Sequence, residues 1–130
     1  MKYIIFLGLF IILFPQFGCE QSTEPAQSDI YVNYEIESAF QDDAVEMLLD
    51  NEVLLKSRVT TDYTISLAWS SGLQKLSGKN HRLHFAVVKY GTEMDYIIDT
   101  SYDTSTVLLR FNRDTKQITI KQIRGIYLRD

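Results

Sequence analysis

Apolar and polar residues alternate with a period of two along most of the chain after residue 29. In the first such segment, residues 30–37, every even position is apolar and the odd positions hold Tyr, Asn, Glu and Glu. Alternation of this kind is typical of a β-strand with one face in the core and the other toward solvent. We therefore predict a half-buried strand over residues 30–37.

Residues 44–59 fit either a β-hairpin or an α-helix. As a hairpin, the segment turns at Asp50-Asn51, because these residue types adopt the left-handed conformations of a tight turn. As a helix, Asp43 caps the first turn, with Glu46 three residues on. Because β-patterns lie on both sides of the segment, we predict the hairpin. Its inward residues are then Val45, Met47, Leu49, Val53, Leu55 and Val59.

Further alternating segments and turn signals complete an all-β pattern. Residues 63–69 and 72–76 are predicted strands on either side of the polar Ser70-Ser71-Gly72 loop. The other predicted strands are residues 81–90, 94–99, 107–111 and 117–124, with a short piece at 126–128 after a bulge at Gly125. Turns about every 8–12 residues are typical of an antiparallel β-sandwich of immunoglobulin-like or jelly-roll-like kind. We predict one such domain over residues 29–130, with about eight short strands.

The N-terminal 18 residues follow a different pattern. Lys2 precedes a continuous apolar run over residues 3–14, and Pro15 interrupts it. A membrane-spanning helix needs about 20 apolar residues, so this run is too short to cross a bilayer. Its length fits the apolar region of a secretory signal peptide. Gly18 and Cys19, the only cysteine in the chain, follow closely.

This ending resembles the signal peptides of bacterial lipoproteins, in which a small residue precedes the cysteine that receives the lipid. Gly18-Cys19 matches that pattern, whereas Gln16 and Phe17 stand where the family prefers an aliphatic and then a small residue. The resemblance implies that Cys19 carries acyl chains such as palmitate and becomes the mature N-terminus. Two or more chains anchor a protein stably to a membrane. The alternatives are an ordinary signal peptide that leaves Cys19 as an unpaired thiol, and an uncleaved anchor.

The resemblance also sets the expected domains and location. Residues 1–18 are the signal peptide, and residues 19–28 are the lipidated cysteine with a polar tether. The nine tether residues after Cys19 reach about 30 Å when fully extended. We expect the protein in the bacterial cell envelope, held by lipid, and at the outer membrane in a Gram-negative cell.

The balance of charge excludes one class of partner. The whole chain has a formal net charge of −4, and removal of residues 1–18 takes away only Lys2, which leaves −5. A nucleic-acid-binding domain is usually basic, so we expect no nucleic acid. Residues 19–54 hold ten acids and no Lys or Arg, whereas residues 105–130 hold six basic residues and two acids. Two readings stay open: an acidic face for a cation or basic partner, or first and last strands that lie side by side and pair their charges, which we favour.

The sequence offers no catalytic grouping. His81 and His84 are three positions apart, which on a strand places them on opposite faces. The chain contains no GxSxG, HExxH, GxGxxG or P-loop pattern. We therefore expect no enzyme activity, no cofactor and no resident metal, and a small hydrolase is the last of our readings. If a cation binds at all, Asp42 and Asp43 are the candidate oxygen ligands for Ca²⁺.

Aromatic residues are the better candidates for binding. Trp69 is the only Trp and precedes the polar residues 70–72, while Tyr63, Tyr90 and Tyr102 lie at or near predicted strand ends. Exposed aromatic rings beside polar groups stack on sugars or contact protein partners. In the alternative reading, Trp69 belongs to the core and the tyrosines are ordinary strand residues. We expect a non-catalytic domain that binds or supports another envelope component, such as a protein or a glycan, with a carbohydrate-binding module built on Trp69 as the alternative.

Overall fold

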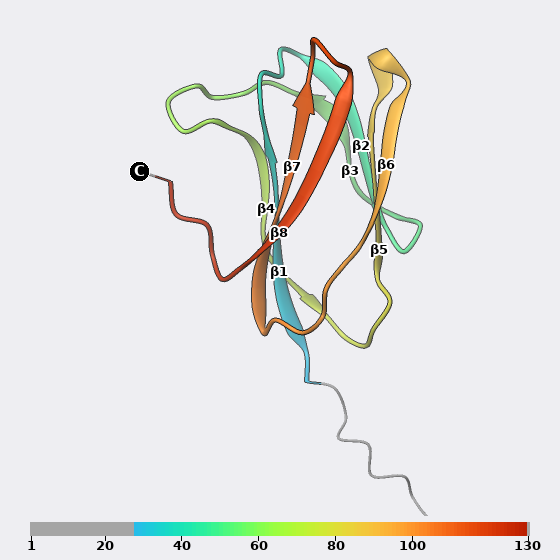
Figure 1. Cartoon of the computed structure of the whole chain (residues 1–130), viewed down its shortest axis with the longest axis vertical. Coiled ribbons are helices and arrows are strands. Elements are labelled where there is room, and N and C mark those ends of the chain that lie inside the picture. Colours follow the sequence, from blue (N-terminus) through green and yellow to red (C-terminus); the bar gives the residue numbers. More distant parts are fainter. Residues whose placement is uncertain (1–27, 130) are drawn as a thin grey trace, which may run out of the picture.

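The structure, a computed structural model, describes residues 28–129, which form two four-stranded β-sheets packed face to face (Figure 1). The predicted all-β sandwich is thereby confirmed. Its strands are β1 (Ile30–Glu37), β2 (Asp43–Leu49), β3 (Glu52–Val59), β4 (Leu67–Leu76), β5 (Arg82–Val87), β6 (Thr92–Ile97), β7 (Thr104–Asn112) and β8 (Gln117–Arg124). A single turn of 3₁₀ helix, η1 (Val88–Tyr90), joins β5 to β6.

The chain crosses between the two sheets several times. Sheet A has the strand order β4-β1-β7-β8, and sheet B has the order β3-β2-β5-β6. Neighbouring strands are antiparallel throughout, except that β1 and β7 run parallel. The chain changes sheet after β1, β3, β4 and β6. As a result β1, the first strand in the sequence, lies inside sheet A with a neighbour on each side.

The core lies between the sheets and follows the predicted alternation. The even positions of β1 are all buried there, as are the alternate residues of β2, β5 and β7. The residues that fill it include Val32, Tyr34, Ile36, Val45, Met47, Leu83, Phe85, Val87, Val107 and Leu109. The hydroxyl of Tyr34 finds no hydrogen-bond partner among the described residues, and its burial raises the pKa of that hydroxyl. Most of the sandwich interior is apolar packing of the kind that drives folding.

The hairpin predicted over residues 44–59 is confirmed, and the helix alternative is wrong. Asp50 and Asn51 have φ angles of 50° and 66°, the left-handed values that a two-residue type I′ turn requires. One inward assignment is wrong. Met47 pairs with Leu55 but Leu48 pairs with Val53, so a bulge in β3 shifts the alternation by one residue. Val53 therefore faces outward and is exposed.

A second bulge joins two predicted strands into one. Residues 63–69 and 72–76 were expected to be separate, but β4 runs without a break from Leu67 to Leu76. Its register against β1 shifts at Ser71 and Gly72. Gly72 takes a φ of 67°, and the Ser71 hydroxyl accepts the backbone N–H of Tyr34. Ser70-Ser71-Gly72, which the sequence predicted to be a loop, is therefore a bulge inside β4. There the Ser71 hydroxyl takes the place of a backbone acceptor.

The outward face of β1 departs most from expectation. The odd positions Asn33, Glu35 and Glu37 were predicted to face solvent, yet they are only 5–6% exposed. Leu108, which pairs with Glu35 on β7, is buried on the same side of the sheet. Since these side chains point away from the core, another part of the chain covers them.

We call residues 125–129 the strap, because they cover that face. Gly125 ends β8 with a φ of 81°, and Figure 1 shows the chain then turning back across sheet A toward β4. The Gly125 N–H donates to the carbonyl of Thr104 at 2.8 Å. The Thr106 hydroxyl donates to the Gly125 carbonyl and accepts the N–H of Tyr127. The short last piece expected at 126–128 is therefore a strap held by side-chain hydrogen bonds, not a ladder strand.

Arg129 fixes the end of the strap on β1. Its Nη2 atom donates a hydrogen bond to Glu35 Oε2. The same atom stands 2.8 Å from Glu37 Oε1, where the two groups form an ion pair but not a hydrogen bond. Arg110 Nε donates to the other oxygen of Glu37 at 2.5 Å. Asn33 donates to Glu35 Oε1 and accepts the Ser70 hydroxyl. Two buried carboxylates are thereby matched by two guanidinium groups.

These contacts account for part of the uneven distribution of charge along the sequence. Acids near the N-terminus pair with basic residues near the C-terminus, as in Glu37–Arg110, Asp43–Arg113 and Glu35–Arg129. The expected neighbours were the first and last strands, and this detail is wrong, because β7 separates β1 from β8. The pairing crosses from β1 to β7 and to the strap instead.

We predict that Arg129→Met lowers the free energy of unfolding by about 3–5 kcal/mol, because it leaves the buried Glu35 without an opposite charge and removes one of the two cations beside Glu37. Arg124→Met is the matched control. Arg124 lies exposed at the end of β8 with its guanidinium over the Tyr102 ring, and its replacement should cost under about 1 kcal/mol. Chemical denaturation of both variants measures the difference, and equal losses would contradict a structural role for Arg129.

Candidate functional site

A group of exposed apolar side chains lies on the strap and on the β3–β4 loop that it meets. We call this surface the strap–loop patch, and it consists of Tyr63, Ile65, Ile126, Tyr127 and Leu128. Leu128 is 81% exposed and Tyr63 is 69% exposed, so both present nearly whole side chains to solvent. Apolar residues scattered singly on a surface are ordinary, but here Ile65, Tyr127 and Leu128 line one shallow pocket, and gathered apolar residues of this kind mark interaction sites.

The loop that carries Tyr63 and Ile65 has a defined conformation. Asp62 Oδ1 accepts the N–H of Thr64, which makes a local turn, and Asp62 and Leu67 form an isolated β-bridge. Ser66 closes the loop with a φ of 53°. Residues 62–66 therefore form a hydrogen-bonded turn, whereas the sequence predicted a strand beginning at Tyr63.

Arg129 joins the two halves of the patch. Its Nη1 atom donates to the carbonyl of Ile65 at 3.4 Å, while the guanidinium lies 5.0 Å from the centre of the Tyr127 ring. A shallow pocket of about 280 Å³ lies at this junction, and it is lined by Thr64, Ile65, Ser66, Tyr127, Leu128 and Arg129. The same guanidinium that neutralises the β1 carboxylates thus holds the strap against the loop.

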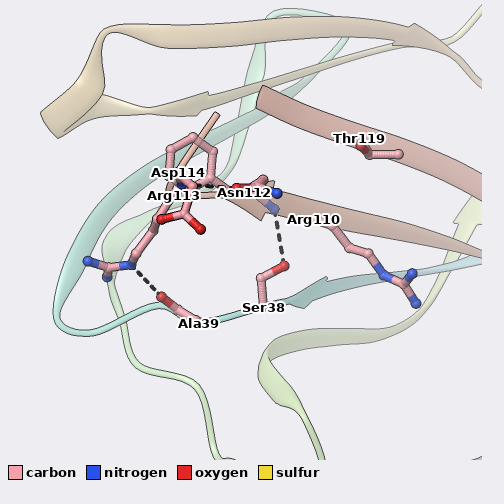
Figure 2. Close-up of a pocket in the computed structure, with 8 residues that line it drawn as sticks. Ser38, Ala39, Arg110, Asn112, Arg113, Asp114 and Thr119 are labelled. Atoms are coloured by element: carbon pink, nitrogen blue, oxygen red, sulfur yellow. Dashed lines mark hydrogen bonds between the residues drawn. The ribbon is translucent and has the colours of Figure 1, made fainter. Parts of the chain in front are cut away.

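A second cleft, of about 540 Å³, lies between the β1–β2 connection and the β7–β8 hairpin (Figure 2). The Ser38 hydroxyl accepts the N–H of Phe111, and Arg113 Nε donates to the carbonyl of Ala39. Figure 2 shows the guanidinium groups of Arg110 and Arg113 pointing away from each other. Each is already paired with a carboxylate, Glu37 and Asp43 respectively. The cleft therefore lacks a surplus of positive charge to attract an anion.

The four predicted aromatic residues do not form one platform. Trp69 pairs with Ile36 in sheet A, is half-buried and packs against the core. The ring of Tyr90 stacks on Phe111 at 5.2 Å, beside the last residues of β7. Tyr102 lies just before the first residue of β7, beneath Arg124. Because β7 is nine residues long, Tyr90 and Tyr102 are at opposite ends of the sandwich.

Of those four, Tyr63 alone belongs to the strap–loop patch. Sequence reasoning missed its four companions, which are Ile65, Ile126, Tyr127 and Leu128. The available signal was weak: three apolar residues follow Gly125 without polar alternation, which also fits a short buried strand. Only the position of the strap on the outer side of sheet A shows that these side chains are exposed.

The candidate calcium ligands are engaged in ion pairs. Asp42 pairs with Arg58 at 2.9 Å, and Asp43 is buried against Arg113. Within residues 28–129, no three His, Cys, Asp or Glu side chains gather in a way that could hold a metal ion. Cys19 lies outside the described residues. No helix in the described part of the chain is both long and apolar enough to cross a membrane.

The two histidines occupy separate sites. His81 Nδ1 stands 2.6 Å from Asp50 Oδ2, and its Nε2 stands 2.8 Å from the carbonyl of Ser77. The hydrogen bond that His81 donates to the Asp50 carboxylate raises the pKa of His81 and lowers the pKa of Asp50. His84 instead contacts Asp95 on the outward face of sheet B. Both ring nitrogens of His81 face acceptors, so the protonated imidazole donates to both and links the β2–β3 turn to the β4–β5 connection.

No protein-family model matches the chain, and no curated protein matches it either. The site must therefore be interpreted from its own geometry.

We predict that stability falls as pH rises from about 6.5 to 8. Folding raises the pKa of His81, so the protonated imidazole stabilises the folded state. This contribution is fully present below the pKa of His in the unfolded chain, about 6.5, and is lost as pH rises through the pKa in the folded protein. The lowered pKa of Asp50 acts in the opposite direction, because its contribution is lost only as pH falls below the usual carboxyl range. The ion pair between Asp50 and His81 therefore stabilises the fold most between about pH 4 and 6.5.

Thermal melts at pH 6 and pH 8 measure this effect. His81→Gln should remove most of the difference in melting temperature between the two pH values, and His84→Gln should retain it. An unchanged difference in His81→Gln would show that another group is responsible.

Proposed function

We propose that this protein is a lipid-anchored component of the bacterial envelope that binds another envelope protein through the strap–loop patch, without catalysis. The patch is the observation that carries the proposal. It presents two tyrosines and three aliphatic side chains on backbone that hydrogen bonds and an ion-paired arginine hold in place. Aromatic and large apolar residues on ordered backbone bind protein partners well, because little conformational entropy is lost on association.

The direction in which the patch faces supports a protein partner. Ile30 pairs with Leu76 at one end of sheet A, and Glu37 pairs with Leu67 at the other end, about 25 Å away. The β3–β4 loop precedes Leu67, so it lies at the end opposite Ile30. If lipid on Cys19 holds the chain, the tether enters at the Ile30 end. The loop half of the patch is then the part of the domain far from the anchoring bilayer, where a protein can reach it.

The other readings have less support from the geometry. The predicted glycan platform was built on Trp69, but Trp69 packs against the core, and Tyr90 and Tyr102 lie at opposite ends of the sandwich. A hydrolase needs an activated nucleophile beside a base. Within residues 28–129, the Asp50–His81 pair reaches the carbonyl of Ser77 and not a hydroxyl.

We predict that Leu128→Ser weakens partner binding at least tenfold, about 1.4 kcal/mol, while the fold stays intact. Leu128 is the most exposed apolar residue of the patch, so its replacement costs little stability. Val88→Ser is the matched control, because Val88 is also exposed but lies in η1, outside the patch.

Photo-crosslinking in cells tests this prediction, with the reactive residue placed at position 128 or at position 88. The expected result is a discrete protein adduct from position 128 that position 88 does not give. Adducts that are identical from both positions, or that contain lipid alone, would contradict a protein-binding patch.

A separate measurement tests the anchor. Mass spectrometry of the protein extracted from membranes should show a mature chain that begins at Cys19 and carries acyl chains. Cys19→Ser should move the protein from the membrane to the soluble fraction. An unmodified thiol at Cys19 in the membrane-bound protein would contradict lipid anchoring and leave the binding patch to be judged by its own test.

A further inference from the structure

The two edge strands of sheet B carry charges of opposite sign on the same face. Lys56 and Arg58 on β3 pair in register with Glu46 and Ala44 of β2. On the same face of the sheet, Glu46 of β2 pairs with Ala86 of β5, which pairs with Glu93 of β6. The other outward acid of β6, Asp95, pairs with His84. All four charged side chains are exposed. The β3 edge therefore presents basic side chains and the β6 edge acidic ones. Within one copy Arg58 also pairs with Asp42, Glu93 pairs with His84, and Asp95 pairs with Arg82 and His84, so contact between copies would add to these ion pairs or exchange them.

The strand directions allow these edges to meet between copies. Each neighbouring pair in the order β3-β2-β5-β6 is antiparallel, so β3 and β6 run in opposite directions. If β6 of one copy lies beside β3 of the next, the two strands form one more antiparallel pair. Sheet B then continues from one molecule to the other, and the unpaired backbone groups of both edges gain partners.

One register matches the side chains on both faces. With Lys56 opposite Asp95, Arg58 falls opposite Glu93, and the outward face gains two pairs of opposite charge. On the inward face the same register places Leu55 opposite Tyr96 and Ser57 opposite Met94. Cross-strand pairs of these kinds each contribute about 0.2–1 kcal/mol.

The alternative pairings are disfavoured. Two β3 strands would oppose basic residues, and two β6 strands would oppose acidic residues. Charges at sheet edges commonly prevent pairing altogether. Here the opposite signs discourage pairing between like edges and favour one combination.

We propose that copies of this chain associate edge to edge, with β3 of one copy paired to β6 of the next. The contact joins different surfaces of the two molecules, so it leaves a free edge at each end. Strands in a sheet twist by about 20–25° each, so four strands turn the next copy by about 80–100°. If lipid on Cys19 holds the chain as proposed above, attachment to one surface raises the effective concentration that the short contact needs.

Zero-length carbodiimide cross-linking tests the contact, because it joins a lysine amine to a touching carboxylate. The full chain is purified from membranes as a mixture of isotopically light and heavy protein and reconstituted in phospholipid vesicles. The expected product links Lys56 of one copy to Asp95 of another and contains both isotopes. Within one copy these residues lie on edges about 14 Å apart, beyond the reach of a lysine–aspartate bond.

Charge exchange supplies the matched control. Arg58→Glu alone and Glu93→Lys alone should each lower the yield of the Lys56–Asp95 link at least fivefold, and an equal mixture of the two variants should restore it. Both side chains are exposed, so both variants should fold. Photo-crosslinking of the partner protein from position 128 should stay unchanged in both. No intermolecular link in the unmodified protein, or no recovery in the mixture, would show that the charges only keep the edges apart.

Discussion

Two carboxylates buried on the outward face of the central strand β1 constrain the rest of the structure. Glu35 and Glu37 point away from the sandwich core, yet both are almost inaccessible to solvent. A buried carboxylate is tolerated only when an opposite charge and hydrogen bonds compensate for its lost hydration. Arg110 on β7 compensates part of this charge, and Arg129 at the end of the strap compensates the rest. The strap must therefore lie across the sheet for β1 to remain where it is.

The same constraint places the candidate binding surface. An apolar strap could slide along an apolar sheet, whereas a guanidinium that must meet two carboxylates fixes its register. Arg129 reaches Ile65 as well, so the strap and the β3–β4 loop are held together by one side chain. Apolar residues that would otherwise close over the sheet are left facing outward, with Leu128 the most exposed. An ionic network beneath an apolar surface gives the patch a fixed shape without hiding it.

Sequence reasoning succeeded where structure is set by neighbours in the chain. Alternation placed the core side of β1, and the Asp50-Asn51 pair identified the β2–β3 turn because both residues readily take left-handed angles. It failed where distant residues decide. Burial of Glu35 depends on Arg129, which is 94 positions away. The bulge at Ser71 depends on the N–H of Tyr34, and Val53 faces outward because β3 bulges against β2. In the candidate site, Tyr63 was identified by its residue type, but its apolar companions became visible only with the strap in place.

Amide hydrogen exchange in the unmodified protein tests most directly whether the strap is part of the fold. The N–H groups of Gly125 and Tyr127 donate to Thr104 and Thr106, so they should exchange as slowly as the amides of β1 and β7. Slow exchange at both positions would mean that the strap opens only when the domain unfolds. Exchange at the rate of a free peptide, while β1 and β7 stay protected, would contradict the account.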